Sequence, residues 1–236
     1  MVSIKPNHIA IIMDGNARWA KQKNKSVIDG HQAGADAVLK AVEYAGKKGI
    51  KYLTLFAFSC ENWSRPKDEI DALMSLCVKV INESLPEFHK NEICVRFIGE
   101  TRELNKEVQE SIAKAYEQTK QNKKLNLTIA LNYGGRQDVV QACQRIAKAA
   151  VKGDIDPDQI SQDMIASYLF TKELPDPDLC IRTSNELRIS NFLLWQFAYT
   201  EMYFCQQFWP DFDEQAFQLA LDEYGRRQRR HGGRRE

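Results

Sequence analysis

The strongest constraint on the fold of this chain is a regular alternation of short apolar runs with long amphipathic stretches. Apolar runs bounded by polar residues predict strands at 8–13, 52–58, 93–98, 125–131 and 179–181. The stretches between them carry apolar residues at a period of about 3.6, most clearly at 69–88 and 139–151, and predict helices that cover the sheet. Strands that alternate with helices form βαβ units, so the expected fold is α/β with a parallel sheet.

The whole chain, residues 1–236, is expected to form one domain. No internal repeat, low-complexity linker or change of composition divides it, and α/β folds of this length are commonly single domains. The one biased segment is 225–236 (GRRQRRHGGRRE), which we expect to be a basic, flexible tail.

Charge and cysteine content exclude several classes of protein. The 33 Lys and Arg residues nearly cancel the 32 Asp and Glu residues, which argues against a nucleic-acid binder. The six cysteines show no C-x-x-C pair, and we expect them to be reduced and buried, as in cytosolic proteins. The apolar run near the N-terminus is too short for a signal peptide or a membrane span. We therefore expect a soluble, cytoplasmic protein, with contact at a membrane surface left open.

Four of the predicted strands are followed by loops that suit anions. In a parallel α/β sheet, ligands bind at the carboxyl ends of the strands. Arg stands beside small residues, Asn or Ser in the loops at 14–19 (DGNARW), 59–66 (SCENWSRP), 132–136 (NYGGR) and 182–191 (RTSNELRISN). We expect these loops to meet at one edge of the sheet.

The first loop has the residues that a diphosphate and magnesium require. Gly15 lets the backbone approach a ligand closely, and a helix beginning near Asn16 offers free N–H groups beside Arg18. Asp14 leaves an apolar strand, where a carboxylate is costly without a cation or donors, so Mg²⁺ shared with a diphosphate is a natural partner. The alternative is that Asp14 only caps the helix. P-loop and dinucleotide-binding glycine spacings are absent, which argues against ordinary nucleotide binding.

A second anion cluster comes from Arg182, Arg188 and Ser190. Arginine presents a planar fork of donors, and two separate cradles suggest two phosphorylated substrates; ordinary surface salt bridging is the alternative. Glu201 is a lone acid in an apolar neighbourhood that needs either Arg or Mg²⁺ as its partner. His31 either contacts a phosphate or caps a long helix.

The chain lacks the usual signs of covalent hydrolysis. No Ser/His/Asp order, nucleophilic cysteine setting or His-rich metal spacing stands out. The expected reaction depends on binding anions and a metal.

Five ordered motifs in this chain resemble those of the cis-prenyltransferases. They stand at 8–20 (HIAIIMDGNARWA), 30–34 (GHQAG), 53–66 (LTLFAFSCENWSRP), 131–136 (LNYGGR) and 181–204 (IRTSNELRISNFLLWQFAYTEMYF). Within the family they are most similar to the bacterial enzymes that make undecaprenyl diphosphate. The resemblance implies a homodimer with a six-stranded, mostly parallel sheet flanked by helices and an apolar product tunnel.

The resemblance also implies a reaction. Isopentenyl diphosphate would be condensed repeatedly onto farnesyl diphosphate with Mg²⁺, creating cis double bonds and giving undecaprenyl diphosphate, a lipid carrier precursor for cell-wall polysaccharide. The product implies transient membrane contact, and the near-neutral charge of the chain disfavours a nucleic-acid partner that would use the basic tail. Two alternatives stay open: a short-chain or branching cis-prenyl diphosphate synthase, and a non-catalytic partner subunit of the same fold.

Residue roles follow from the positions that match the family motifs. Asp14 would engage magnesium and assist catalysis, Asn62 would assist proton removal, and Glu201 would be the second magnesium ligand. The implied substrate-binding residues are Gly15, Asn16, Ala17, Arg18, Trp19, His31, Ser59, Cys60, Glu61, Trp63, Arg65, Arg182, Arg188, Ile189 and Ser190. The chain departs from the family pattern at Ala17 and Asn185, where Gly is frequent, and at Val27, where an Arg is expected. Asn185 is still expected to adopt a left-handed turn.

Overall fold

The structure, a computed structural model, describes residues 5–228 and has a six-stranded sheet at its centre. The strand order is β3-β4-β2-β1-β5-β6, and all pairings are parallel. The strands are β1 (His8–Ile12), β2 (Tyr52–Ser59), β3 (Ile93–Ile98), β4 (Leu125–Tyr133), β5 (Leu179–Arg182) and β6 (Glu201–Phe204). The α/β class and the six-stranded sheet are confirmed, and the sheet is wholly rather than mostly parallel.

Seven α-helices and five short 3-10 helices connect the strands within the described residues. The α-helices are α1 (Asn16–Gln22), α2 (Val27–Lys47), α3 (Lys67–Lys90), α4 (Lys106–Thr119), α5 (Gly135–Val151), α6 (Gln162–Tyr168) and α7 (Glu214–Arg226). The 3-10 helices are η1 (Cys60–Ser64), η2 (Thr101–Glu103), η3 (Pro157–Gln159), η4 (Gln196–Tyr199) and η5 (Trp209–Asp211).

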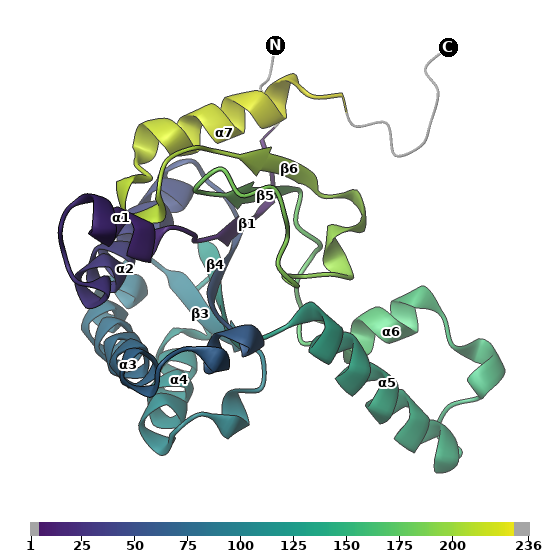
Figure 1. The fold of residues 1–236 in the computed structure, drawn as a ribbon. Helices are drawn as coiled ribbons and strands as arrows, with labels where there is room; N and C mark the ends of the chain where they lie inside the picture. Colours follow the sequence, from purple (N-terminus) through teal and green to yellow (C-terminus); the bar gives the residue numbers. More distant parts are fainter. Residues whose placement is uncertain (1–4, 229–236) are drawn as a thin grey trace.

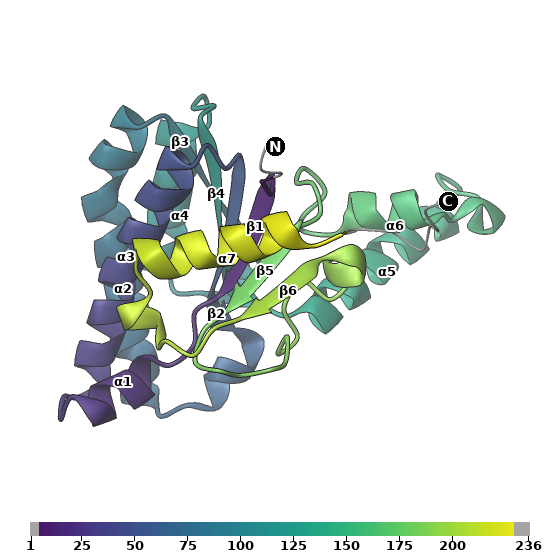
Figure 2. The ribbon, with the colours of Figure 1, turned by 90° about the horizontal axis from the view of Figure 1, so that it is seen from above.

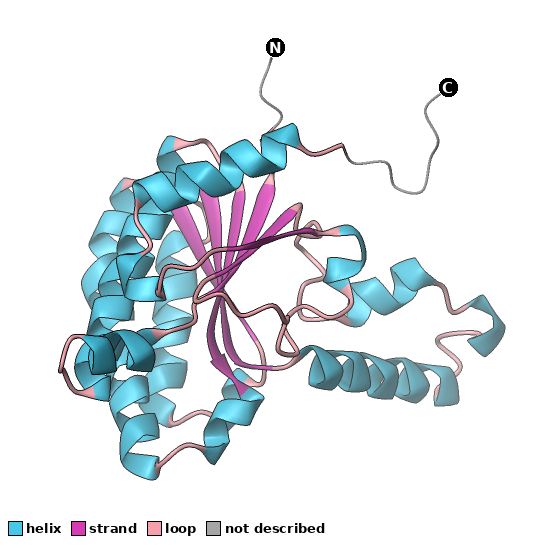
Figure 3. Ribbon diagram, turned by 45° about the horizontal axis from the view of Figure 1, so that its top comes forward, coloured by secondary structure: helices cyan, strands magenta, loops and turns pink. Residues whose placement is uncertain are grey.

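One face of the sheet carries the main hydrophobic core. Side chains alternate along a strand, so Ile9 and Ile11 of β1 point to this face and Ala10 and Ile12 to the other. Helices α2, α3, α4 and α7 contribute to this core and lie over the face in Figures 1 and 2. Figure 3 shows the strands side by side in one fan beneath this helical layer.

The opposite face is covered mainly by the segment that follows β5. Phe192 is fully buried there and stacks on Phe56 of β2 with ring centroids 4.3 Å apart. This packing fixes the chain just after the arginine loop, so it also fixes the carboxyl edge of the sheet.

Helices α5 and α6 pack on each other and project away from the sheet as a two-helix arm (Figure 2). The buried side chains of α5 are Asp138, Ala142 and Ile146, whereas Val140 and Cys143 are exposed. The prediction that 139–151 covers the sheet is therefore wrong, because an apolar period identifies a helix but not the element against which it packs. The segment 69–88, by contrast, lies within α3 and covers the sheet as predicted.

The first residues of the predicted flexible tail are ordered by a helix and an ion pair. Gly225 and Arg226 are the last residues of α7, and Arg227 forms an ion pair with Glu201 at 2.9 Å. The rest of the predicted tail, from residue 229, lies outside the described residues.

The cysteines are free thiols, as expected. Cys94, Cys180 and Cys205 are buried, Cys60 and Cys77 are half-buried, and Cys143 is exposed, which corrects the expectation that all would be buried. Between residues 5 and 228, no helix combines the length and apolar character needed to cross a bilayer.

Candidate active site at the carboxyl edge of the sheet

The loops after β1, β2 and β5 meet around a cavity of about 770 Å³. The predicted site residues that line it are Asp14, Gly15, Asn16, Ala17, Arg18, His31, Ser59, Glu61, Asn62, Arg65, Arg182, Arg188 and Ser190. The structure does not place Trp19, Cys60, Trp63, Ile189 or Glu201 on its wall. Three of the four predicted loops therefore meet at one edge of the sheet, as expected.

The loop after β1 turns sharply at Gly15 into α1. Gly15 has a φ of 108°, and a Cβ atom there would lie 2.1 Å from Oγ of Ser184, so only glycine fits. Gly15 is the N-cap of α1, and no side chain caps that helix. Asp14 is therefore not a helix cap, and its backbone carbonyl instead accepts hydrogen bonds from the hydroxyls of Thr183 and Ser184 at 2.6 and 2.8 Å.

The carboxylate of Asp14 is held by two arginines. Its Oδ2 lies 2.8 Å from Arg182 and its Oδ1 lies 3.0 Å from Arg18. Partial burial acts to raise the pKa of Asp14, but the hydrogen bonds and charges of Arg182 and Arg18 outweigh it and hold the pKa below its ordinary value. Asp14 is therefore ionised at neutral pH.

Arg182 is the buried anchor of the arginine loop. Its side chain is only 4% exposed, and it donates to Ser190 Oγ at 2.7 Å and to the Arg188 carbonyl. Its Nε has no hydrogen-bond partner among the described residues. Ser184 and Asn185 hold left-handed backbone at φ 72° and 55°, so the expected left-handed turn at Asn185 is observed.

Glu186 joins the two arginine clusters and was not identified from the sequence. Its Oε1 accepts from Arg18 at 2.7 Å, and its Oε2 pairs with Arg188. Hydrogen bonding and charge from Arg188, together with Arg18, hold the pKa of Glu186 below its ordinary value. No local pattern marks a Glu inside an arginine loop as a bridge, because its partner Arg18 is far away in the sequence.

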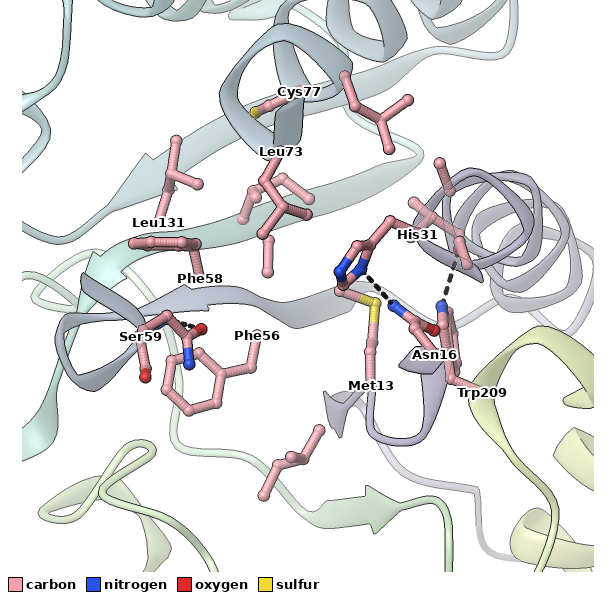
Figure 4. A pocket seen from close by; sticks show the side chains of 18 of the residues that line it. Met13, Asn16, His31, Phe56, Phe58, Ser59, Leu73, Cys77, Leu131 and Trp209 are labelled. Carbon is pink, nitrogen blue, oxygen red and sulfur yellow. Dashed lines mark hydrogen bonds between the residues drawn. The ribbon is translucent and has the colours of Figure 1, made fainter. Parts of the chain in front are cut away.

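His31 lies inside α2 and faces the cavity from the helix side (Figure 4). Ser26 caps α2, so His31 is not the cap. Its Nε2 is 3.2 Å from Glu69, which also pairs with Arg65 at 3.1 Å. Burial lowers the pKa of His31 against the opposing effect of Glu69, so the ring is neutral at pH 7. Glu69 is a second site residue that the sequence did not reveal.

The loop after β2 is closed by its own capping interactions. The Asn62 Oδ1 accepts from the backbone N–H of Ser59 at 3.0 Å, so this oxygen is engaged with the backbone. Trp63 points away from the cavity, since its Nε1 donates to Asn132 at 2.7 Å and its ring packs edge-on against Phe58. Trp63 supports this wall rather than lining it.

Asn191 ties three of the four loops together and was also missed. Its backbone carbonyl accepts from Gly135 N at 2.6 Å, and its Oδ1 accepts from Arg136 N at 2.8 Å. Its Nδ2 donates to Glu61 at 2.8 Å. The NYGGR loop thus enters the site indirectly, by holding the residue that follows Ser190.

Beneath the charged mouth, the cavity is apolar and lies between α3 and the sheet. In Figure 4, Leu73 and Cys77 of α3 face Phe58 and Leu131 across this space. The lining continues to Leu76, Val80, Ile81, Leu85, Phe88, Val95 and Leu127. Burial raises the pKa of Cys77 to about 12, so its thiol is neutral and adds no charge to the cavity.

Glu201 and Trp19 lie apart from this cavity. Glu201 begins β6 beside Leu179, whereas Arg182 pairs with Phe204 at the other end of that strand, so Glu201 is remote from Asp14 within one chain. Within one chain the Glu201 carboxylate pairs with Arg227, so of the two expected partners, Arg and Mg²⁺, the structure supplies Arg. Trp19 donates to Asp211 at 2.8 Å. The described part of the chain has no group of three or more His, Cys, Asp and Glu side chains that would hold a metal.

The fold and the site together define a class: a parallel α/β protein with arginine cradles at the carboxyl edge of its sheet and a long apolar cavity below. Residues 12–232 match the sequence model of a protein family described as "Putative undecaprenyl diphosphate synthase". The chain belongs to this undecaprenyl diphosphate synthase family of prenyltransferases.

Relatives cover nearly the whole chain. An isoprenyl transferase from Streptococcus thermophilus is 51% identical over 97% of this chain and 93% of its own length. A ditrans,polycis-undecaprenyl-diphosphate synthase, (2E,6E)-farnesyl-diphosphate specific, from Haemophilus influenzae is 50% identical over 97% of this chain and 95% of its own. The crystal structure of lavandulyl diphosphate synthase from Lavandula x intermedia, in complex with dimethylallyl diphosphate, has a TM-score of 0.93 and 37% identity, and covers 95% of this chain and 97% of that one.

Proposed function

We propose that this protein is a magnesium-dependent cis-prenyltransferase that condenses isopentenyl diphosphate repeatedly onto farnesyl diphosphate to make undecaprenyl diphosphate. The observation that carries the proposal is the joining of a charged mouth to one long apolar cavity. A prenyl diphosphate has the same division, with an anionic head and an apolar chain. Relatives named as farnesyl-specific undecaprenyl synthases, about 50% identical over nearly the full length, support the choice of substrates and product.

In the proposed site, two diphosphates occupy the two arginine cradles. The allylic diphosphate lies at Gly15–Arg18, where a tight turn and the first N–H groups of α1 are available. The isopentenyl diphosphate lies at Arg182, Arg188 and Ser190. Arginine forks stabilise the negative charge that develops on the leaving diphosphate, and holding both substrates in register makes the condensation effectively unimolecular.

Asp14 is the proposed magnesium ligand within this chain. An ionised carboxylate is the hard oxygen donor that Mg²⁺ takes together with substrate phosphate oxygens, so the residues present fit the ion. When bound, Mg²⁺ neutralises charge on the departing diphosphate. Since Asp14 is the only metal ligand proposed there within one chain, we expect Mg²⁺ to bind with the diphosphate rather than before it.

We also propose a homodimer with transient contact to the inner membrane face. The α5–α6 arm leaves Val140 and Val151 exposed, and β6 is an edge strand of the sheet. Glu201 as a second magnesium ligand remains part of this proposal only through a second copy of the chain, because its own Asp14 is remote.

A short-chain synthase is the second candidate, since the TM-score of 0.93 is with lavandulyl diphosphate synthase bound to dimethylallyl diphosphate. One experiment separates the two. The protein is incubated with labelled isopentenyl diphosphate, Mg²⁺ and either farnesyl or dimethylallyl diphosphate, and the products are sized by chromatography. Long products from farnesyl diphosphate support the proposal. Products that stop after one condensation support the short-chain candidate, and no product contradicts both.

A further inference from the structure

Five charged side chains form one continuous chain of ion pairs across the mouth of the cavity. Arg182 pairs with Asp14, Asp14 with Arg18, Arg18 with Glu186, and Glu186 with Arg188. Three arginines and two carboxylates leave one net positive charge. The loops after β1 and β5 are therefore linked through arginines that would also bind a diphosphate.

Glu186 has the geometry of an internal substitute for a diphosphate. It offers one oxygen to Arg18, in the cradle after β1, and the other to Arg188, in the cradle after β5. A substrate diphosphate in either cradle would approach the same guanidinium groups. In this structure both of these arginines are therefore already engaged.

The two carboxylates differ in how easily they can be displaced. Arg182, which holds Asp14, is 4% exposed, whereas the side chains of Arg18 and Arg188 are 44% and 61% exposed. Exposed ion pairs contribute little and exchange readily, while a buried arginine does not give up its partner without loss. Asp14 is thus the fixed carboxylate, and Glu186 is the exchangeable one.

We propose that Glu186 is a positioning residue that occupies both arginine cradles when they are empty, yields them to substrate diphosphates, and reclaims them after each condensation. This inference rests on the proposed function, because each condensation releases one diphosphate that must leave before the next isopentenyl diphosphate enters. Glu186 then weakens the binding of every diphosphate and speeds the departure of the by-product.

The test compares Glu186→Gln with the wild type and with Glu43→Gln. Glutamine has the shape of glutamate without its charge, and Glu43 is an exposed partner of Lys47 on α2, so the control makes the same charge change away from the cavity. Binding of inorganic pyrophosphate without metal is measured by calorimetry. We expect Glu186→Gln to bind about three- to tenfold more tightly than the wild type, as loss of two exposed ion pairs implies.

Steady-state kinetics give the second readout. We expect Glu186→Gln to lower both the KM for isopentenyl diphosphate and kcat, with stronger inhibition by added pyrophosphate. Glu186→Asp keeps the charge but loses reach, and we expect its pyrophosphate affinity to fall between the other two.

Three outcomes would each contradict either the role proposed for Glu186 or the proposed function. Weaker pyrophosphate binding by Glu186→Gln would show that Glu186 orients the arginines for substrate, which overturns the proposal. Unchanged binding and kinetics would overturn it as well. A wild type that fails to elongate any prenyl diphosphate would contradict the proposed function instead, and the pyrophosphate titration would still decide the role of Glu186.

Discussion

Asp14 is positioned by two guanidinium groups that come from opposite ends of the sequence. Arg18 follows it by one helical turn, and Arg182 ends the neighbouring strand β5. The carboxylate is therefore ionised and oriented without a ligand, which suits the role proposed for Asp14, in which it meets a metal and a diphosphate together.

Asp14→Asn tests this role at the scale of one residue. Asparagine keeps an oxygen for hydrogen bonding but loses the charge, so we expect prenyl transfer to fall about 100-fold or more. Arg182 retains its bonds to Ser190 and the Arg188 carbonyl, so circular dichroism should show an intact fold. Turnover is measured with Mg²⁺ present and Glu43→Gln as the control. Normal product formation by Asp14→Asn would remove Asp14 from the metal site.

His8 couples folding to pH at a position far from the site. It is 1% exposed and bonded to Thr54 and Pro175, and burial lowers its pKa to about 4. In the unfolded chain the His8 imidazole takes up a proton near pH 6.5, whereas in the folded chain it does so only near pH 4. Stability is therefore full above pH 6.5 and declines as the pH falls toward 4, by about 3 kcal/mol in total.

Urea unfolding at pH 7.5 and 5.0 measures this effect. We expect the free energy of unfolding to be lower at pH 5.0, and His8→Asn to reduce the difference between the two pH values. His31 also has a lowered pKa and contributes in the same direction, so His31→Asn serves as the companion variant. An unchanged pH dependence in His8→Asn would contradict the assignment.

Sequence patterns locate a site residue better than they locate its partners. The position of Asp14, Arg18 and Arg182 at the carboxyl edge could be predicted, because each follows an apolar run that ends at that edge of the sheet. Glu186, Glu69 and Asn191 could not, since their roles depend on contacts between loops that are distant along the chain. Glu201 was assigned to the metal site from the family resemblance, but within one chain it does not lie near Asp14.

At the scale of elements, α3 acts as one wall of the cavity and as a layer of the core. Its buried residues include Ile70, Met74, Val78 and Leu85, while the partly exposed Val80 lines the cavity. Met74 and Leu85 also border the cavity, so the same side chains of α3 belong to the core and line the open space.

Val80→Phe tests whether this space sets the length of the product. A ring at Val80 fills part of the cavity, so we expect shorter products while the first condensation stays within about twofold of the wild-type rate. Lys79→Phe places the same ring at an exposed neighbouring position of α3 and is the control. Chromatographic sizing gives the result, and full-length product from Val80→Phe would contradict the idea that the chain grows along α3.

Periodicity predicted the elements more reliably than their packing. Five apolar runs correspond to β1–β5, but β6 was not recognised from the residues because EMYF is short and carries a charge. Helix α5 was recognised, yet it buries Asp138, Ala142 and Ile146 instead of covering the sheet. A parallel sheet leaves both faces to be covered, and the pattern of one helix does not say which face it takes.

At the scale of the molecule, the α5–α6 arm is the part least supported by the rest of the chain. Val140 is 55% exposed and Val151 is 89% exposed on α5, so apolar surface on the arm is left for a partner.

Val140→Glu tests whether a second copy covers this surface. We expect the wild type to sediment as a dimer and Val140→Glu to shift toward the monomer, because a charge would be desolvated at the contact. Leu39→Glu, at another exposed apolar position on α2, is the control and should remain dimeric. Analytical ultracentrifugation measures the change, and a stable Val140→Glu dimer would place the contact elsewhere.

The apolar cavity between α3 and the sheet also bears on stability. A growing prenyl chain would supply there the contacts that side chains supply elsewhere in the core, so each added unit would make the folded protein harder to melt. The finished product would then be a temporary part of the interior, and its departure would expose apolar surface on both sides at once. A bilayer that takes up the chain as it emerges keeps the apolar surface of the product out of water, so that only the emptied cavity is exposed. Release of the product would then be a transfer of the prenyl chain from the protein interior to the bilayer.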